Sequence, residues 1–254
     1  RDRSVSRGLG DVYKRQLYVV AYQQNLHFKQ LFKVLELMGF EKAADMEHIA
    51  FGMVSLEDGA MSTRSGRVVW LSEVLDKAVE KARGIIEEKN PDQADKDAVA
   101  ESVGVGAVVF SALWNNRIKD IVFSFDKVLN FDGETAPYVQ YTHARCASTL
   151  RKGGAFDLAA ADMGAICSEE GIDVVKCLLS FEDTVRAAAK TREPCMVTRY
   201  AVELAEKFNR FYIGHRIVGG DAGATNARLF LAYMVKNTLK TALGLIGIDA
   251  PESM

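Results

Sequence analysis

The sequence has few cysteines, few prolines and no excess of charge of either sign. Its 254 residues include 4 Cys and 4 Pro, and 32 Lys and Arg stand against 34 Asp and Glu. The cysteines are widely spaced and form no Cys-x-x-Cys pair, so we expect reduced thiols and neither a disulfide framework nor a metal site. The charge balance does not indicate a nucleic-acid partner by itself, although a local basic surface is compatible with it.

Long hydrophobic runs are also absent. No stretch approaches the ~18 consecutive apolar residues that a transmembrane helix needs, so we expect no membrane segment. Hydrophobic residues make up 48% of the chain and charged residues 26%. This composition is globular and excludes a disordered or collagen-like protein. The length is sufficient for one large domain or two ordinary ones.

The first sixteen residues differ in character from the rest. Residues 1–16 are rich in basic side chains, show no apolar periodicity and lack the apolar segment of a signal peptide. Their last six residues, DVYKRQ, resemble a translated sequencing-library adaptor. We therefore predict that residues 1–16 are a non-native leader and that the natural sequence enters near Leu17.

Residues 17–70 carry the pattern of an α/β structure. Apolar, β-rich stretches predict strands over 17–21 and 48–56. Between them, apolar residues at positions i, i+3, i+4 and i+7 predict a helix that Asn25 caps and that ends before Gly39. A strand–helix–strand order is typical of a parallel sheet.

Beyond residue 70 the hydrophobic periodicity is helical. An apolar stripe predicts a helix from Leu71 to Ile86 that stops before Pro91. Further helices are predicted over 95–116, 136–150, 155–170, 174–192, 196–212 and 224–245. The glycines of VGVG, residues 103–106, lack the third glycine and the preceding strand of a nucleotide loop, so they predict close helix packing. We place boundaries near Trp70 and Gly133.

A polar loop over residues 59–66 is the first candidate for chemistry. It lies between a predicted strand and a predicted helix and contains serine, threonine and arginine. Hydroxyls, backbone N–H groups and a guanidinium at such a turn suit an anion. Its spacing alone favours a solvated surface loop.

The second candidate begins at residue 133. Thr135 is placed to cap a helix, and Tyr138 and Tyr141 then share one face with Arg145 beyond them. Aromatic rings beside basic side chains suit stacking on unpaired bases together with phosphate contacts. Two tyrosines on a helix also fit a half-buried core position, and Tyr212 has the same two interpretations.

Taken together, several segments resemble the arginyl-tRNA synthetases, a family of class I aminoacyl-tRNA synthetases. They are residues 17–32, 61–78, 103–152 and 250–254, in the order of the family, and GETAPYVQYTHAR over 133–145 is the most specific. The resemblance implies a mainly α fold. It assigns 17–70 to the C-terminal remnant of a Rossmann-type α/β catalytic domain, 71–132 to a helical connecting region and 133–254 to an all-α anticodon-binding bundle.

The resemblance also implies an activity. Such enzymes are cytoplasmic and attach arginine to its tRNA through arginyl-adenylate, with ATP as a substrate and Mg²⁺, and with no tightly bound cofactor, membrane partner or DNA partner. Residues Met61, Ser62, Thr63 and Arg64 match the KMSKS-type loop that closes over the ATP phosphates, where cations are needed. Here Ala60 and Thr63 stand at the lysine positions of the motif, which leaves Arg64 as the cation of the loop.

The remaining site residues follow from the same resemblance. Gln24 matches a glutamine that faces the arginine substrate, where an amide can both donate and accept hydrogen bonds. The positions that contact the anticodon loop are matched by Tyr138, Tyr141, Tyr212 and Met254, and Arg145 supplies a positive charge beside them. Stacking on a base contributes roughly 1–3 kcal/mol of binding free energy.

One family motif is missing from the sequence. No segment resembles the His-Ile-Gly-His signature, and none resembles the family's N-terminal tRNA-binding domain. Because catalysis here depends on positioning both substrates, we expect the parent enzyme to be active and this chain by itself to be inactive.

Two alternatives remain open at this stage. The chain could be a stand-alone tRNA-binding module without catalysis, although the α/β part has no use in such a module. It could also be a helical scaffold in which the tyrosines and arginines anchor a protein partner. Binding of an anticodon stem–loop RNA separates these two alternatives.

Overall fold

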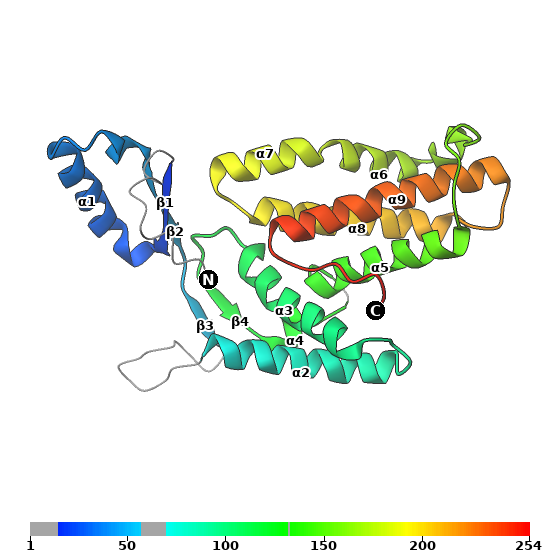
Figure 1. The fold of residues 1–254 in the computed structure, drawn as a ribbon, viewed down its shortest axis with the longest axis horizontal. Helices are drawn as coiled ribbons and strands as arrows, with labels where there is room; N and C mark the ends of the chain where they lie inside the picture. Colours follow the sequence, from blue (N-terminus) through cyan, green and yellow to red (C-terminus); the bar gives the residue numbers. More distant parts are fainter. Residues whose placement is uncertain (1–14, 57–69, 132) are drawn as a thin grey trace. The chain divides into compact units, whose positions relative to one another are not determined.

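The computed structural model describes residues 15–56, 70–131 and 133–254. The chain forms two compact units: the first is Arg1–Ser55 with Arg117–Val122, and the second is Leu56–Asn116 with Phe123–Met254 (Figure 1). Most of the predicted leader, residues 1–14, lies outside the described residues. The predicted phosphate loop, Met61, Ser62, Thr63 and Arg64, also lies outside them.

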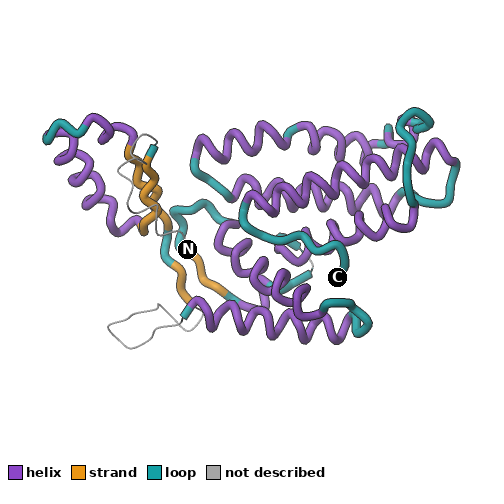
Figure 2. Tube along the Cα trace, in the orientation of Figure 1, coloured by secondary structure: helices purple, strands orange, loops and turns teal. Residues whose placement is uncertain are grey.

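The first unit contains the predicted parallel pair of strands. Strand β1 (Gln16–Ala21) pairs with β2 (Met46–Phe51) in parallel, with Gln16 opposite Met46. The helix α1 (Asn25–Leu37) and the short 3₁₀ helices η3 (Tyr22–Gln24) and η4 (Glu41–Asp45) connect the two strands (Figure 2). Phe28 packs α1 against the sheet, with its ring centroid 4.3 Å from that of His48. The prediction of a parallel α/β structure is confirmed, and its first strand begins one residue earlier than predicted.

Two local predictions in this unit are wrong. Asn25 is the first residue of α1 rather than its cap, and the preceding Gln24 makes no side-chain capping bond. The predicted strand over 48–56 is divided into β2 and β3 (Val54–Leu56), and β3 pairs with β4 (Ile121–Phe123). Gly52 lies where the predicted strand is divided. A Cβ there would lie 2.2 Å from the Lys119 carbonyl oxygen, so this close approach of the two backbones requires glycine.

The second unit begins with two closely packed helices, α2 (Leu71–Lys89) and α3 (Lys96–Trp114). A Cβ on Gly104 would lie 2.6 Å from the backbone nitrogen of Val79, so only glycine permits this approach. The interpretation of the VGVG segment as close helix packing is confirmed. By length and hydropathy α3 could cross a membrane, but its apolar side chains pack against other helices of the second unit.

The rest of the second unit is a helical bundle. It consists of α4 (Phe125–Val128), α5 (Ala136–Gly153), α6 (Glu169–Leu179), α7 (Phe181–Thr191), α8 (Cys195–Gly214) and α9 (Ala222–Leu245). Its core is formed by fully buried side chains such as Phe208, Phe211 and Leu239. The cysteines carry free thiols, and burial raises the pKa of Cys177 to about 11.

The bundle departs from the predicted helices at two places. The helix predicted over 155–170 is wrong, because residues 155–168 form a loop and α6 begins only at Glu169. The loop contains one 3₁₀ turn, η6 (Met163–Ile166), where the Asp162 side chain accepts a hydrogen bond from the Gly164 N–H. The helix predicted over 174–192 is divided at Ser180, whose hydroxyl donates to the Cys177 carbonyl oxygen at 2.8 Å. At both places a polar side chain bonds the local backbone and competes with a continuous helix.

Candidate nucleic-acid interface

Helix α5 begins at the predicted cap and presents the candidate aromatic residues. The Thr135 Oγ1 accepts a hydrogen bond from the Tyr138 backbone N–H at 3.4 Å, and Pro137 lies in the first turn. This start fixes the helical phase of the residues that follow. Tyr141 and Arg145 are therefore one helical turn apart on the same face.

Arg145 joins two tyrosines from different helices. Its guanidinium carbon lies 4.8 Å from the ring centroid of Tyr141 on α5 and 5.2 Å from that of Tyr212 on α8. Its Nη1 donates to the Asn209 Oδ1 at 2.6 Å. The two cation–π contacts and the hydrogen bond hold the guanidinium between the rings.

The three candidate tyrosines have different surroundings. Tyr141 is 42% exposed, whereas Tyr138 and Tyr212 are half-buried and pack against the bundle core. The Tyr138 hydroxyl accepts from the Asn209 Nδ2 at 3.0 Å, and the same amide donates to the Thr142 Oγ1 at 3.0 Å. Each sequence interpretation thus fits a different residue: Tyr141 presents an open ring, and Tyr138 supports the core beneath it.

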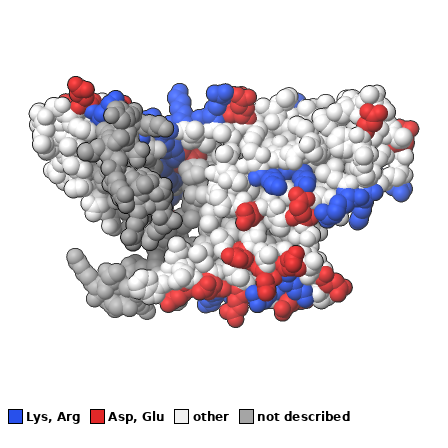
Figure 3. All heavy atoms as spheres, in the orientation of Figure 1, with Lys and Arg blue, Asp and Glu red and all other residues white. Residues whose placement is uncertain are grey.

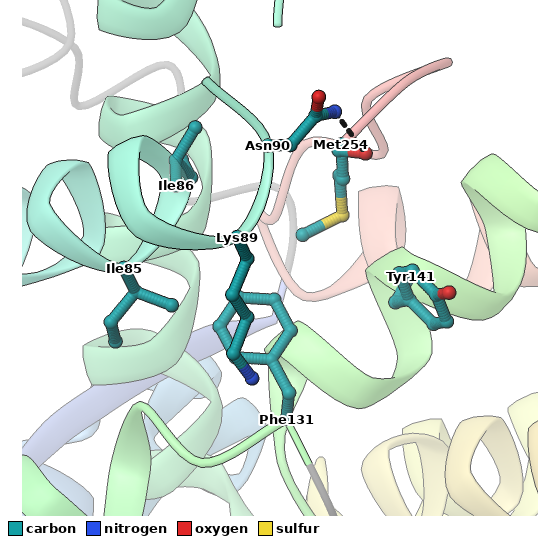
Figure 4. A pocket seen from close by; sticks show the side chains of 7 residues that line it. All are labelled: Ile85, Ile86, Lys89, Asn90, Phe131, Tyr141 and Met254. Carbon is teal, nitrogen blue, oxygen red and sulfur yellow. Dashed lines mark hydrogen bonds between the residues drawn. The ribbon is translucent and has the colours of Figure 1, made fainter. Parts of the chain in front are cut away.

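Two neighbouring pockets of about 390 Å³ each share Tyr141, Met254 and Asn90 in their walls. The first pocket is largely apolar, and Figure 4 shows the Met254 side chain pointing into it. Its other walls are Ile85, Ile86, Lys89 and Phe131. The second pocket is polar, and its walls include Gln93, Arg145, Ser148, Thr149, Arg151, Lys152 and Tyr212. An apolar and a cationic compartment therefore meet at Tyr141 and Met254.

The charge differs between this site and another groove of the same unit. The described residues that line the second pocket include Arg145, Arg151 and Lys152 but no aspartate or glutamate. A groove between α2 and α3 is lined by Asp76, Glu80, Asp97 and Glu101 together with Arg83, and Figure 3 shows acidic side chains gathered along α2. A polyanion is favoured at the second pocket and repelled by the α2–α3 groove.

Asparagine and glutamine side chains fix the last residues of the chain beside Tyr141. The Asn90 Nδ2 donates to the Met254 carbonyl oxygen at 3.2 Å, and the Gln93 Nε2 donates to the Ser253 Oγ at 2.9 Å. Sequence reasoning found Tyr138, Tyr141, Arg145, Tyr212 and Met254, which the structure brings together. It missed Asn90, Gln93 and Asn209. Of these three, only Asn209 could have been found from the sequence, because it lies three residues before Tyr212 and therefore on the same face of a predicted helix.

Gln24 lies in the first unit. It is exposed and ends η3, directly after the carboxyl end of strand β1. In open parallel sheets, ligands bind outside the carboxyl ends of the strands. The position of Gln24 therefore suits a small-molecule contact. The other predicted catalytic residues, Met61–Arg64, lie outside the described residues.

Comparison with known proteins accounts for both units. Residues 139–254 match the DALR anticodon binding domain, and residues 6–125 match the catalytic domain of class I tRNA synthetases (R). The chain is 50% identical over 242 residues to the arginine–tRNA ligase of Halothermothrix orenii and 47% identical to that of Clostridioides difficile. The chain belongs to the arginyl-tRNA synthetase family. This confirms the resemblance and the fold class predicted from the sequence.

The solved structures of the family extend the match to three dimensions. The Thermus thermophilus arginyl-tRNA synthetase superposes with a TM-score of 0.86 at 35% identity, covering 94% of this chain and 41% of that one. The arginyl-tRNA synthetase of Plasmodium falciparum shares the fold with a TM-score of 0.79 at 23% identity, covering 96% of this chain and 43% of that one. The matches to the Halothermothrix orenii and Clostridioides difficile ligases include 95% of this chain. They span 43% of the length of each of these relatives.

Proposed function

We propose that residues 133–254 bind the anticodon stem–loop of a tRNA and that Tyr141 stacks on an unpaired base. The observation that carries this proposal is the exposed ring of Tyr141, held by the Arg145 guanidinium at 4.8 Å in the wall shared by two pockets. A ring fixed in this way loses little conformational freedom when a base stacks on it. The match of residues 139–254 to an anticodon-binding domain supports this assignment.

The other site residues have separate parts in this proposal. Tyr212 and Met254 line the second pocket together with Tyr141 and extend the stacking surface, and Tyr138 supports it through Asn209. Arg145 places a positive charge beside the bound base, close to the RNA backbone. Arg151 and Lys152 line the same pocket and are available to phosphate groups.

Residues 17–70 contribute, in this proposal, to the active site of an arginine–tRNA ligase. Gln24 faces the arginine substrate, and the loop with Met61, Ser62, Thr63 and Arg64 closes over the ATP phosphates, with Arg64 supplying positive charge. Mg²⁺ arrives with ATP as part of the substrate. The complete enzyme forms arginyl-adenylate and transfers the arginyl group to tRNA in the cytoplasm. The match of residues 6–125 to the catalytic domain supports this part.

Titration of an anticodon stem–loop RNA against the full chain tests the RNA site. Replacing Tyr141 by Phe should change the binding free energy little, whereas replacing it by Ala should weaken binding by roughly 1–3 kcal/mol. Tyr233→Ala is a matched control, because Tyr233 is 44% exposed on α9 and lines neither pocket.

Thermal melts on the same samples separate binding from folding. The stacking role is wrong if Tyr141→Ala melts and binds as the parent chain does. A chain that binds no stem–loop but captures a protein through the same tyrosines would instead favour the scaffold alternative.

The catalytic part is testable in a chimaera. Residues 17–254 would replace the matching segment of the Halothermothrix orenii relative, which is 50% identical, and arginine-dependent ATP–pyrophosphate exchange would be measured. We expect exchange in the chimaera and a loss of it in the Gln24→Ala and Arg64→Ala variants. A folded chimaera whose exchange is unaffected by both substitutions would contradict these residue roles.

A further inference from the structure

Three polar side chains of α5 are fully buried, and one of them, Thr142, bonds within the bundle to the Tyr138 carbonyl and to Asn209. The other two have different partners. Gln140 and His143 are both 0% exposed. Burying such groups is unfavourable unless they form hydrogen bonds. Neither has a part in the stacking surface itself, so their positions in this helix require another explanation.

Both side chains bond the backbone of the last residues of the chain, which we call the C-terminal strap (residues 247–254). The Gln140 Nε2 donates to the Asp249 carbonyl oxygen at 2.8 Å, and the His143 Nδ1 lies 2.9 Å from the Pro251 carbonyl oxygen. Since a carbonyl oxygen only accepts, the His143 Nδ1 carries the proton in this bond. The strap is therefore held through its backbone at two positions two residues apart.

Further contacts continue along the strap toward its end. Arg151 Nη1 donates to the Glu252 carbonyl oxygen at 3.1 Å, and the Glu252 carboxylate pairs with Lys236 Nζ at 2.7 Å. The next residues, Ser253 and Met254, are held by the Gln93 and Asn90 bonds described above. These contacts bring the Met254 side chain into the wall that it shares with Tyr141.

The fold leaves room for this arrangement. A Cβ on Gly106 would lie 3.0 Å from the Ile248 Cγ2 and 3.1 Å from the Gln140 Nε2, so a side chain at this place in α3 would press on both. Gln140 also donates to the Ser102 carbonyl oxygen at 3.1 Å, which ties α3, α5 and the strap at one point. The buried amide thus fixes the strap where it leaves the core.

We infer that Gln140 and His143 are positioning residues, which hold the C-terminal strap so that Met254 completes the RNA-binding surface beside Tyr141. This inference rests on the proposed anticodon-loop site. It predicts that loss of the His143 donor acts on RNA binding through the strap and not through the core. The two routes are separable, because the strap can be shortened.

The first test compares two substitutions of His143 in the full chain. His143→Asn keeps an N–H donor but removes volume, whereas His143→Leu keeps more volume but removes the donor. We expect His143→Leu to weaken binding of a synthetic anticodon stem–loop about tenfold and His143→Asn to weaken it less than about threefold. Weaker binding by the Asn variant than by the Leu variant would overturn the inference, because volume would then matter more than the donor.

The second test is a double-mutant cycle with deletion of residues 251–254. If His143 acts through the strap, His143→Leu should weaken RNA binding no further in the shortened chain. Equal loss from His143→Leu in the full and shortened chains would overturn the inference, since the effect would then arise in the bundle core.

A spectroscopic readout follows the strap without RNA. The methyl signal of Met254 in a ¹³C-methyl-methionine spectrum is assigned by its loss in Met254→Leu. It should move toward the unfolded position in His143→Leu and stay in place in His143→Asn. An unchanged signal in His143→Leu overturns the inference, even if the parent chain binds no stem–loop and the proposed function has failed.

Discussion

The two units differ in what they do with apolar side chains. The second unit buries large residues completely, including Phe110, Phe208 and Phe211. The first unit has few buried apolar residues among those described. It exposes others on β1, on α1 and at the residue that follows α1: Leu17, Val19, Leu26, Val34, Leu37 and Met38. A parallel sheet is normally covered on both faces, and two strands offer little surface for a core. The helical unit therefore has a hydrophobic core of its own, whereas internal packing contributes little to the stability of the α/β unit.

The largest expected effect tests whether the two units are stabilised separately. Phe208→Ala should lower the free energy of unfolding of the helical unit by about 3–5 kcal/mol, since the lost ring is fully buried. Phe28→Ala should leave that transition in place and increase hydrogen exchange in β1 and β2 instead, because Phe28 packs on Tyr18, Phe32 and His48. Urea unfolding followed by helical circular dichroism checks the first result, and exchange mass spectrometry checks the second.

Separate stabilisation of the two units is contradicted if Phe28→Ala shifts the urea unfolding transition of the helices as far as Phe208→Ala does. The stability of the helical unit would then depend on the packing of the first unit.

A pair of glycines tests how tightly the helical unit is packed. Gly104→Ala should destabilise this unit by about 1–3 kcal/mol, because the new Cβ would meet the Val79 backbone at 2.6 Å. Gly84→Ala on α2 should stabilise it by about 0.5–1 kcal/mol, since no atom lies within 4 Å of the new Cβ and alanine favours the helix. Urea unfolding of both variants measures the difference. A loss of stability in both would mean that the space around Gly84 does not accept a methyl group.

Acidification should weaken the helical unit through His143. Burial holds the pKa of His143 below its usual range, an effect that Lys236 and Lys240 reinforce and that the Pro251 carbonyl and Glu252 oppose. The unfolded chain therefore binds a proton near pH 6.5 that the folded chain resists, so stability falls as the pH drops below that value. We therefore expect the free energy of unfolding to be lower at about pH 5 than at about pH 7.

The control for this effect is the His143→Asn variant, which cannot titrate. Urea unfolding at the two pH values should show a smaller loss for that variant than for the parent chain. An equal loss in both would assign the pH dependence to other groups.

The smallest effect on stability is expected at the exposed face of the first unit. Leu37 is 76% exposed, so Leu37→Gln should change the free energy of unfolding by less than about 0.5 kcal/mol. The same change should reduce self-association, because it interrupts an exposed apolar surface. Light scattering at matched concentrations checks this, and increased association of the variant would contradict it.

The sequence predicted those features that depend on neighbouring residues. The apolar stripe from Leu71 to Ile86 and the Thr135 cap are local, and both appear in the structure. The division of the second predicted strand depends on Lys119, which is far from Gly52 in sequence. The role of Asn209 likewise depends on Tyr138 and Arg145, on another helix. Residue types and periodicity do not encode such contacts, so the sequence predicted the rings of the site but not the amides that hold them.

The segment Arg117–Val122 comes between α3 and α4 in the sequence but belongs to the first unit. The chain therefore passes between the units after Ser55, after Asn116 and again after Val122. Two backbone hydrogen bonds hold the segment Arg117–Val122 in the first unit. The Ile121 N–H donates to the Met53 carbonyl oxygen at 2.9 Å, and the Gly52 N–H donates to the Arg117 carbonyl oxygen at 2.7 Å. A recombination breakpoint between residues 56 and 70 would separate these partners. The first unit is thus not a terminal cassette that gene fusion could exchange, and any viable exchange must carry the returning segment with it.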